Sequence, residues 1–320
     1  MMPENSPNDI VKLGLIRHVI LHSTNQSQVD VSHPQFVSAV PVKQAETDEQ
    51  LIALWLHGRS KHTQRAYLAD IQHFCIFTQK SFREIKLGDI QEFENSLTEQ
   101  KLEQNSINRT LAAVKSLISF AHRIGYLPFD VGRPVKLTAA KDTLAERILS
   151  ENEVYRIIES EPNPRNKLIL KMLYCSAVRV SELSNLCWKD IQEREDGGQV
   201  TVFGKGNKTH TVLLPLSIWL ELTAYRNGSA DENQPLFKSR KNNKLCCSQI
   251  LRIVKKSADR AGLTKSVSPH WFRHSHASHA LEHNAPIHLV QQTLAHSSVA
   301  TTGRYLHARP TDSSSKYLNV

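Results

Sequence analysis

Helical periodicity is the feature that most restricts the fold of this 320-residue chain. It is clearest over residues 106–121, where apolar side chains return every three or four positions to one face of a helix. That face consists of Ile107, Leu111, Val114, Leu117, Ile118 and Ala121. Gly125 and Pro128 follow it, and both are typical of a helix end. This pattern predicts a helix that buries one side against other helices.

Two segments before it show the same spacing. Ser60, Asp89 and Ser106 are the candidate N-caps of the three helices, because their side chains can accept a hydrogen bond from a free backbone N–H. Residues 47–130 are therefore predicted to form an all-helical unit. Residues 1–46 show no helical or strand periodicity and are predicted to be a mobile leader, to which we assign no function.

Residues 131–145 differ in composition from both neighbours and predict an exposed basic linker. They contain Gly132, Pro134 and three basic residues, Arg133, Lys136 and Lys141. Residues 146–308 are predicted to form a second unit, whose first helix opens with the capping-box pair Ser150 and Glu153. Residues 309–320 are left as a short C-terminal tail.

One feature of the second unit is not helical. Residues 199–203 and 210–214 are rich in β-branched side chains and are joined by a glycine-rich turn, Gly204–Lys208. This predicts a β-hairpin. The predicted fold class is mainly α, with a helical N-terminal unit and a mixed α/β, mostly helical, second unit that contains a small antiparallel hairpin or sheet.

Composition excludes several classes of protein. No stretch approaches the roughly 20 apolar residues of a membrane span, and Lys12, Arg17 and His18 interrupt the N-terminal apolar patches, so no secretory signal is predicted. The five cysteines are scattered and form no C-x-x-C pair. Neither a disulfide framework nor a cysteine zinc site is therefore expected, and the predicted location is the cytoplasm or nucleoid.

The net charge of +9 favours a polyanionic partner. The excess lies in both predicted units: residues 51–141 carry 13 basic and eight acidic side chains, and residues 142–320 carry 24 and 17. Residues 1–50 carry three basic and six acidic side chains, so the start of the chain does not share this excess. Charge alone does not distinguish a nucleic-acid-binding protein from a merely basic one.

Two segments place a cation at a break in regular structure. Arg179 follows an apolar helical run, and Glu182 at i+3 can hold its guanidinium. Lys205 lies between two glycines in the hairpin turn, where an ammonium can approach a phosphate unobstructed. Taken singly, a surface ion pair and a charged turn explain these residues better.

Two further segments combine histidine with other polar groups. Ser268 and Pro269 predict a helix start that places His270 and Arg273 on one face of the first turn, where a phosphate would be favoured. His296 ends one helical pattern, Ser297 or Ser298 can cap the next, and that helix carries Tyr305. Alone, each of these motifs is a frequent coincidence.

Other tyrosines and histidines could serve different chemistry. Tyr317 lies in the tail and Tyr174 in an apolar helix, so neither is favoured as a nucleophile, and Tyr174 is expected to be packed. Five histidines cluster at 270, 274, 276, 279 and 283. No H-E-x-x-H pattern and no carboxylate or cysteine ligands accompany them, so no metal site is predicted.

Together the motifs are far more specific. In order and spacing they resemble the tyrosine recombinase (phage integrase) family, most closely its simple bacterial Xer-like members, over roughly residues 50–307. The matching residues are Arg179, Lys205, His270, Arg273, His296 and Tyr305. Ala177 and Ala295 depart from the family, which usually has glycine at these two positions.

The resemblance implies a fold and a reaction. Residues 47–130 would be a helical core-binding (SAM-like) domain and residues 146–308 the catalytic domain. Tyr305 would attack a DNA phosphodiester, giving a 3′-phosphotyrosyl link and a free 5′-hydroxyl, without ATP, metal or other cofactor. Arg179 and Arg273 would stabilise the phosphate, and Lys205 would protonate the leaving oxygen. His270 would assist with the tyrosine proton, His296 would hydrogen-bond the phosphate, and Glu182 would support this set.

It also implies partners. The expected partner is a double-stranded DNA recombination site, held by a clamp of both domains in a homotetramer or a hetero-tetramer with a related recombinase. Candidate DNA contacts are Arg59, Lys61 and Arg65 in the first unit and Arg133, Lys136 and Lys141 in the linker. Two alternatives stay open here: a catalytically idle DNA-binding or architectural protein, and type IB topoisomerase-like strand relaxation.

Overall fold

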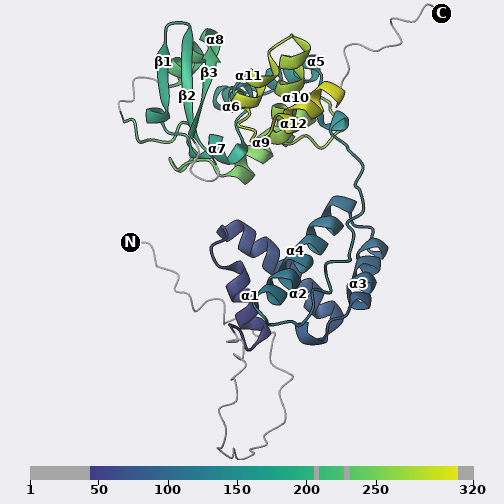
Figure 1. The fold of residues 1–320 in the computed structure, drawn as a ribbon. Helices are drawn as coiled ribbons and strands as arrows, with labels where there is room; N and C mark the ends of the chain where they lie inside the picture. The colour runs from purple at the N-terminus through teal and green to yellow at the C-terminus, as the bar shows by residue number, and fades with distance from the viewer. Residues whose placement is uncertain (1–43, 205–208, 227–230, 309–320) are drawn as a thin grey trace, which may run out of the picture. The chain divides into compact units, whose positions relative to one another are not determined.

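The computed structural model of the chain describes residues 44–204, 209–226 and 231–308 (Figure 1). The chain divides into two compact units, Met1–Thr138 and Ala139–Val320. This division falls inside the segment predicted to be a linker. Val135 is still buried in the core of the first unit and Leu144 already in a core of the second, so the mostly exposed stretch between them is residues 136–143.

The first unit is helical throughout its described part. Its elements are α1 (Asp48–Leu56), α2 (Lys61–Thr78), η2 (Phe82–Glu84), α3 (Leu87–Glu99) and α4 (Gln104–Arg123). All six apolar residues of the predicted face of α4 are buried, and they contact α1, α2 and α3. The helix ends where Gly125 adopts a left-handed conformation with φ 75°, as its position predicted.

The predicted helix starts are correct for one helix and wrong for two. Ser60 caps α2. Asp89 lies instead in the first turn of α3, whose N-cap is Lys86, and its carboxylate accepts the Lys86 N–H at 2.8 Å. α4 starts before Ser106, with Glu103 as N-cap. An acidic residue is favourable anywhere in the first turn of a helix, so its presence does not identify the first residue.

The second unit combines a small sheet with a larger set of helices. Its elements are η3 (Ala145–Arg147), α5 (Glu151–Glu159), α6 (Pro164–Cys175), α7 (Val180–Asn185), η4 (Trp188–Asp190), β1 (Ile191–Arg194), β2 (Gly197–Phe203), β3 (Thr209–Pro215), α8 (Leu216–Arg226), α9 (Cys247–Arg260), α10 (Pro269–Glu282), α11 (Ile287–Thr293) and α12 (Val299–Ala308). The predicted capping box of Ser150 and Glu153 is present at α5.

The sheet has one strand more than the predicted hairpin. Its order is β1-β2-β3, all antiparallel, with Val200 paired to Ile191 on one side and Val212 on the other. Helix α8 covers the sheet so closely that a Cβ on Gly198 would lie 2.5 Å from the Trp219 ring. Only the first residue of β1 is buried, so its sequence lacks the alternation of apolar and polar residues that would predict a strand.

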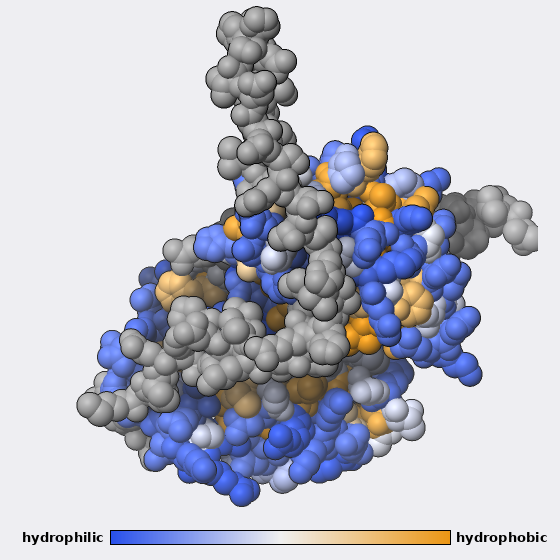
Figure 2. All heavy atoms as spheres, turned by 90° about the horizontal axis from the view of Figure 1, so that it is seen from below, coloured by the Kyte–Doolittle hydropathy of each residue, from blue (hydrophilic) through white to orange (hydrophobic). Residues whose placement is uncertain are grey.

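Helix α10 is the centre of the second unit, where it contacts α6, α11 and α12 (Figure 1). A small core between these elements contains Ala277, Val290, Leu294 and Tyr305. No helix in the described ranges is long and apolar enough to cross a membrane. The face seen in Figure 2 is mostly hydrophilic, with apolar side chains in small separate groups.

Candidate active site

Arg179 is held at the break between α6 and α7. It is the N-cap of α7, and its backbone N–H donates to Glu182 Oε2 at 2.7 Å while its guanidinium donates to Oε1 at 2.8 Å. The predicted pairing is therefore present. The carboxylate is buried with 4 % of its side chain exposed, whereas 36 % of the Arg179 side chain is exposed. Glu182 thus fixes an arginine that still presents N–H donors to solvent.

Arg273 is the most buried cation of the site, with 4 % exposed. Its guanidinium donates to the carbonyl oxygens of Ala177, at 2.6 Å, and Leu294. Burial, with nearby Arg179, lowers the pKa of Arg273 to about 10, so it remains charged at neutral pH. A guanidinium has five N–H donors, and these two bonds leave others for an anion.

The two carbonyls that hold Arg273 come from strained turns. Ala177 has φ 50° and Ala295, next to Leu294, has φ 46°. Both lie in the left-handed region, which costs a residue with a Cβ roughly 1–2 kcal/mol. These are the two positions at which the sequence departs from the glycines of the family it resembles. The turns form with alanine, and Arg273 donates to one carbonyl in each.

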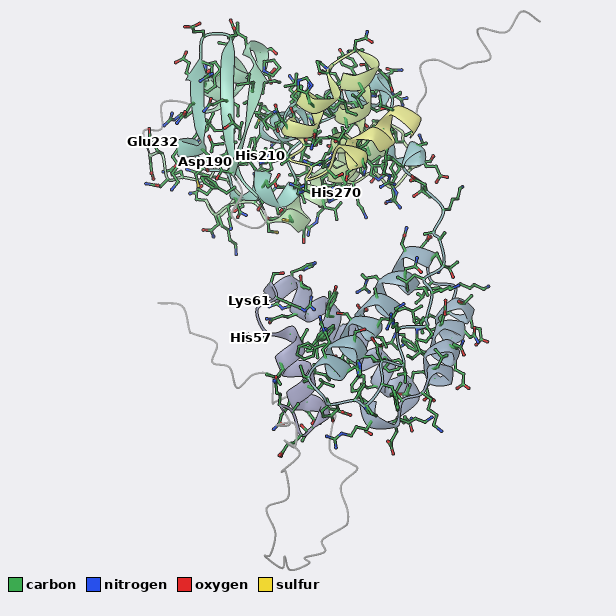
Figure 3. The ribbon with its side chains drawn as sticks, viewed as in Figure 1. His57, Lys61, Asp190, His210, Glu232 and His270 are labelled. Atoms are coloured by element: carbon green, nitrogen blue, oxygen red, sulfur yellow. The ribbon has the colours of Figure 1, made fainter. Side chains whose placement is uncertain are left out.

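Two predicted histidines flank this cluster. His270 is exposed in the first turn of α10, after Ser268 as N-cap and Pro269 at N1 (Figure 3). His296 stacks on the Tyr305 ring, with centroids 6.5 Å apart and planes at 7°, and its Nδ1 lies 3.0 Å from the Thr302 hydroxyl. Burial and then Arg273 lower the pKa of His296 to about 4, so its ring is neutral at pH 7.

Tyr305 lies on α12 with 5 % exposed. The helix starts after Ser298, whose hydroxyl accepts the Ala300 N–H at 3.3 Å, as one of the two predicted caps. Burial raises the pKa of Tyr305, while Arg273 and Arg304 oppose that rise. Its hydroxyl lies 2.9 Å from Nδ1 of His274.

Two histidines of this site were not predicted from the sequence. His274 was expected only as a member of the histidine cluster, yet it contacts the Tyr305 hydroxyl. His210, on β3, has a buried Nε2 without a hydrogen-bond partner in the described residues. Burial lowers the pKa of His210, and Glu182, Arg273 and Arg179 are the charges that act on it. The one sequence signal for His210 was its position in a β-branched run, where alternate side chains face the same side of the sheet. Any residue of an ordinary strand has the same signal.

The remaining predicted residues are distributed as follows. Lys205 lies outside the described residues, between β2 and β3. The Arg59 guanidinium lies against the stacked Trp55 and Tyr67 rings, at 5.1 and 5.0 Å from their centroids. Lys61, Arg65, Arg133, Lys136 and Lys141 are exposed. Lys61 extends from the start of α2, near His57 at the end of α1 (Figure 3).

The structure also shows the contacts of residues that were considered for other roles. The Tyr174 hydroxyl lies 2.8 Å from Nδ1 of His279, and the ring packs against the core of the unit, as predicted. Lys141 forms an ion pair with Glu146 at 2.9 Å. Within the described part of the chain, no group of three or more histidine, cysteine or carboxylate side chains is arranged to hold a metal ion.

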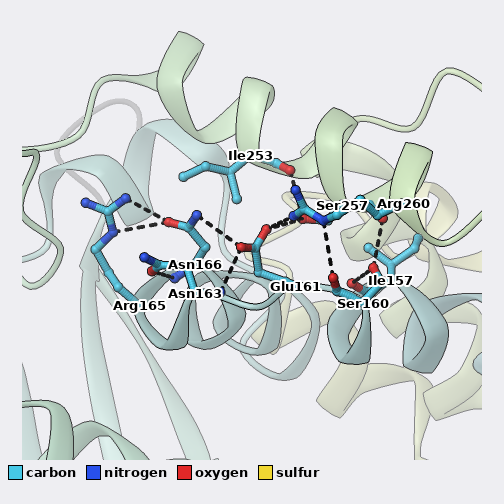
Figure 4. Close-up of polar contacts among 9 residues, drawn as sticks. All are labelled: Ile157, Ser160, Glu161, Asn163, Arg165, Asn166, Ile253, Ser257 and Arg260. Carbon is cyan, nitrogen blue, oxygen red and sulfur yellow. Dashed lines mark hydrogen bonds and ion pairs between the residues drawn. The ribbon is translucent and has the colours of Figure 1, made fainter.

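A recess of about 400 Å³ lies between the start of α6, α9 and residues 239–245. Glu161 lies on one side of this recess and joins its walls (Figure 4). Its carboxylate accepts hydrogen bonds from the Ser257 hydroxyl at 2.7 Å and the Asn163 N–H at 3.1 Å, and it forms an ion pair with Arg260. Four lining cations have no hydrogen bond or ion pair with any described residue. They are Arg240, Lys241, Arg252 and Lys256.

Sequence comparison identifies the class of protein to which this site belongs. The model of the phage integrase family matches residues 147–312, and that of the phage integrase N-terminal SAM-like domain matches residues 49–125. The chain therefore belongs to the phage integrase family of tyrosine recombinases. The expected fold class is confirmed in both units.

Comparison with individual relatives supports the same family. The tyrosine recombinase XerC of Thermodesulfovibrio yellowstonii is 29% identical over 265 residues, which cover 78% of this chain and 87% of the relative. The tyrosine recombinase XerD of Oceanobacillus iheyensis is 30% identical over 266 residues, covering 78% and 89%. The fold also resembles a lambda integrase tetramer bound to a Holliday junction, with TM-score 0.69, 14% identity, and 83% and 77% of the two chains covered. The chain is a site-specific DNA recombinase, and the idle and topoisomerase-like alternatives are not favoured.

Proposed function

We propose that Tyr305 is the nucleophile of this recombinase. Its oxygen attacks the phosphorus of a DNA phosphodiester and the bond to the 5′-oxygen breaks, leaving a 3′-phosphotyrosyl link and a free 5′-hydroxyl. A 5′-hydroxyl from a partner strand then reverses the attack. The observation that carries this proposal is a buried tyrosine that contacts His274 and His296 and lies near Arg273, with Arg179 near Arg273 in turn.

Arg179 and Arg273 supply the charge that the transition state needs. Arg179 is close enough to Arg273 to lower the pKa of Arg273, and the Glu182 carboxylate bound to Arg179 opposes that effect. A phosphate that gains negative charge during attack relieves this repulsion more in the transition state than in the ground state. His296 donates a further hydrogen bond to a phosphate oxygen in this scheme.

Lys205 is the proposed general acid for the 5′-oxygen. In the sequence it follows β2 and precedes β3, and the charges of Glu182, Arg273 and Arg179 act on His210 of β3, which supports this proposal. The energy of the broken ester is kept in the phosphotyrosyl bond, so the reaction needs no ATP. No step of this scheme uses a metal ion or another cofactor.

The proposed substrate is a double-stranded DNA recombination site. The proposed location of the protein is the cytoplasm, in association with nucleoid DNA. The tetramer in the lambda integrase structure supports a tetrameric assembly on two sites, built from this chain alone or with a related recombinase. The helical unit before Thr138 is the proposed core DNA-binding domain, with Lys61 and Arg65 as exposed candidates for phosphate contacts. Arg59, Arg133, Lys136 and Lys141 remain proposed contacts of the same kind.

The recess beside α9 is a further proposed contact with the DNA backbone. Its unpaired cations would each release a counterion on binding a phosphate, which makes the affinity salt-dependent. Replacing Arg252 and Lys256 together by alanine is expected to reduce the slope of log affinity against log salt by about 1 for each phosphate that the variant no longer binds. An unchanged slope would exclude the recess from the interface.

Covalent trapping tests the proposal. The full chain is mixed with sheared DNA from the organism that encodes it, quenched with detergent, and the protein-linked 3′ ends are sequenced. Adducts at a discrete site that disappear in Tyr305→Phe establish the nucleophile. Tyr174→Phe is the matched control, because it also removes a partly buried hydroxyl bonded to a histidine.

Other outcomes count against parts of the proposal. Adducts that persist in Tyr305→Phe would show that another residue is the nucleophile. Relaxed plasmid without recombinant junctions would favour topoisomerase-like activity. Tight binding without any adduct would favour an idle DNA-binding protein.

A further inference from the structure

One contact of the catalytic tyrosine has no role in the mechanism above. The Tyr305 hydroxyl lies 2.9 Å from Nδ1 of His274, and their ring centroids are 5.9 Å apart. Among the described residues this is the only hydrogen bond of that hydroxyl. His274 is on α10 and Tyr305 on α12, two helices in direct contact, so both ends of the bond lie on rigid elements.

The two histidines predicted from the sequence do not make this contact. His296 lies face to face with the Tyr305 ring, and its Nδ1 is bonded to Thr302 instead. His270 is one turn before His274 on α10, with ring centroids 6.4 Å apart, and no hydrogen bond joins it to Tyr305 in the described structure. A proton acceptor has to lie within about 2.6–3.2 Å of the oxygen that it deprotonates, and His274 meets this requirement.

The surroundings of His274 keep its ring uncharged. Burial is the main reason that its pKa is lowered to about 4. Positive groups face it from α10, η3 and α12: His270, Arg273, Arg147 and Arg304. A neutral imidazole has one ring nitrogen that can accept a proton, whereas an imidazolium has none. His274 is therefore a neutral imidazole throughout the neutral range, with one ring nitrogen able to accept a proton.

We infer that His274 is the proton acceptor for the Tyr305 nucleophile, a role that rests on the proposed function of Tyr305. The hydroxyl proton passes to His274 Nδ1 as the tyrosine oxygen forms its bond to phosphorus and the bond to the 5′-oxygen breaks. The departing oxygen takes its proton from the general acid. In the reverse step His274 returns the proton to the tyrosine. Incoming phosphate charge stabilises the imidazolium that exists between the two steps.

The test compares three variants of the full chain. His274→Ala removes the contact, and His274→Asn keeps an amide at the position of Nδ1 that can hold the hydroxyl but cannot take its proton. His276→Asn is the matched control, since His276 is a partly buried histidine on the same helix whose Nδ1 bonds the Tyr174 carbonyl. The substrate is a nicked duplex that carries the site recovered by covalent trapping, and the rate of adduct formation is measured from pH 6 to pH 9.

Wild-type protein and His276→Asn are expected to cleave at rates that change little with pH. Both His274 variants are expected to lose about 100-fold at pH 7. Their rates should rise by close to tenfold per pH unit, because attack then depends on the small fraction of tyrosinate. DNA affinity, measured separately, should be unchanged in all three variants.

Three results would overturn the inference. Asparagine at 274 with wild-type rates would show that the residue only positions the hydroxyl. Faster cleavage in His274→Ala would show that the contact restrains the tyrosine. An equal loss at every pH would show a structural effect. If wild-type protein gives no adducts, the proposed function has failed, and the role of His274 fails with it.

Discussion

Ala295→Gly is expected to stabilise the second unit. Ala295 has φ 46° and its side chain is exposed, so the methyl group makes the turn strained and buries no surface in return. Relief of a left-handed conformation is worth roughly 1–2 kcal/mol. The greater freedom of glycine in the unfolded chain offsets about 0.4–1 kcal/mol of that gain. The net increase in the free energy of unfolding is centred on roughly 0.8 kcal/mol, within a range of about 0–1.6 kcal/mol.

The same change at Ala177 is expected to have almost no effect on stability. Ala177 has φ 50°, but it is fully buried beside Leu294 and Tyr305. Deleting its methyl group removes about 0.8 kcal/mol of burial, and the small cavity that remains adds to this cost. The gain and the cost therefore nearly cancel. The two alanines share one backbone conformation and differ in exposure, so the pair separates backbone strain from packing.

Thermal unfolding of the full chain by tryptophan fluorescence measures both effects, since Trp188, Trp219 and Trp271 all lie in the second unit. Ala295→Gly is expected to raise Tm by about 1–4 °C for a unit of this size. Ala224→Gly, at an exposed position in α8, is the control and is expected to lower Tm. If Ala295→Gly lowers Tm as much as the control does, the strain argument is wrong.

Three further perturbations test the supporting contacts. Glu182→Ala removes both acceptors of Arg179 and is expected to slow adduct formation by about 100-fold, whereas Glu182→Gln keeps an acceptor and should be slowed less. Glu161→Ala removes the acceptor of the buried Ser257 hydroxyl and is expected to cost about 1–3 kcal/mol, so a urea midpoint close to that of wild type would contradict the network in Figure 4. The pKa of His274 is about 4 in the folded chain, against an ordinary value of 6.5. On acidification the unfolded chain therefore binds the proton first, and the free energy of unfolding should fall as the pH drops from 6.5 to 4. This group alone contributes roughly 2 kcal/mol of the decrease at pH 5, and in His274→Asn the pH dependence of the urea midpoint should flatten.

The sequence by itself determined the features that depend on near neighbours. The cap at Ser60, the capping box at Ser150 and the helix end at Gly125 were all predicted, because each involves residues within one turn of a helix. The order of the catalytic motifs was also sufficient to identify the family. Where several positions in one turn satisfy the same local rule, as at Asp89, the sequence predicted the helix but not its first residue.

Only the tertiary structure decided which groups meet in the site. Arg273 binds the carbonyl of Ala177, 96 positions away in the sequence, and His274 meets Tyr305 across 31. The left-handed turns at Ala177 and Ala295 run against the preference of alanine. The physical reason is that these contacts depend on how α10 packs against α6 and α12. That packing is a sum of many weak contacts between distant residues, and periodicity and spacing do not encode it.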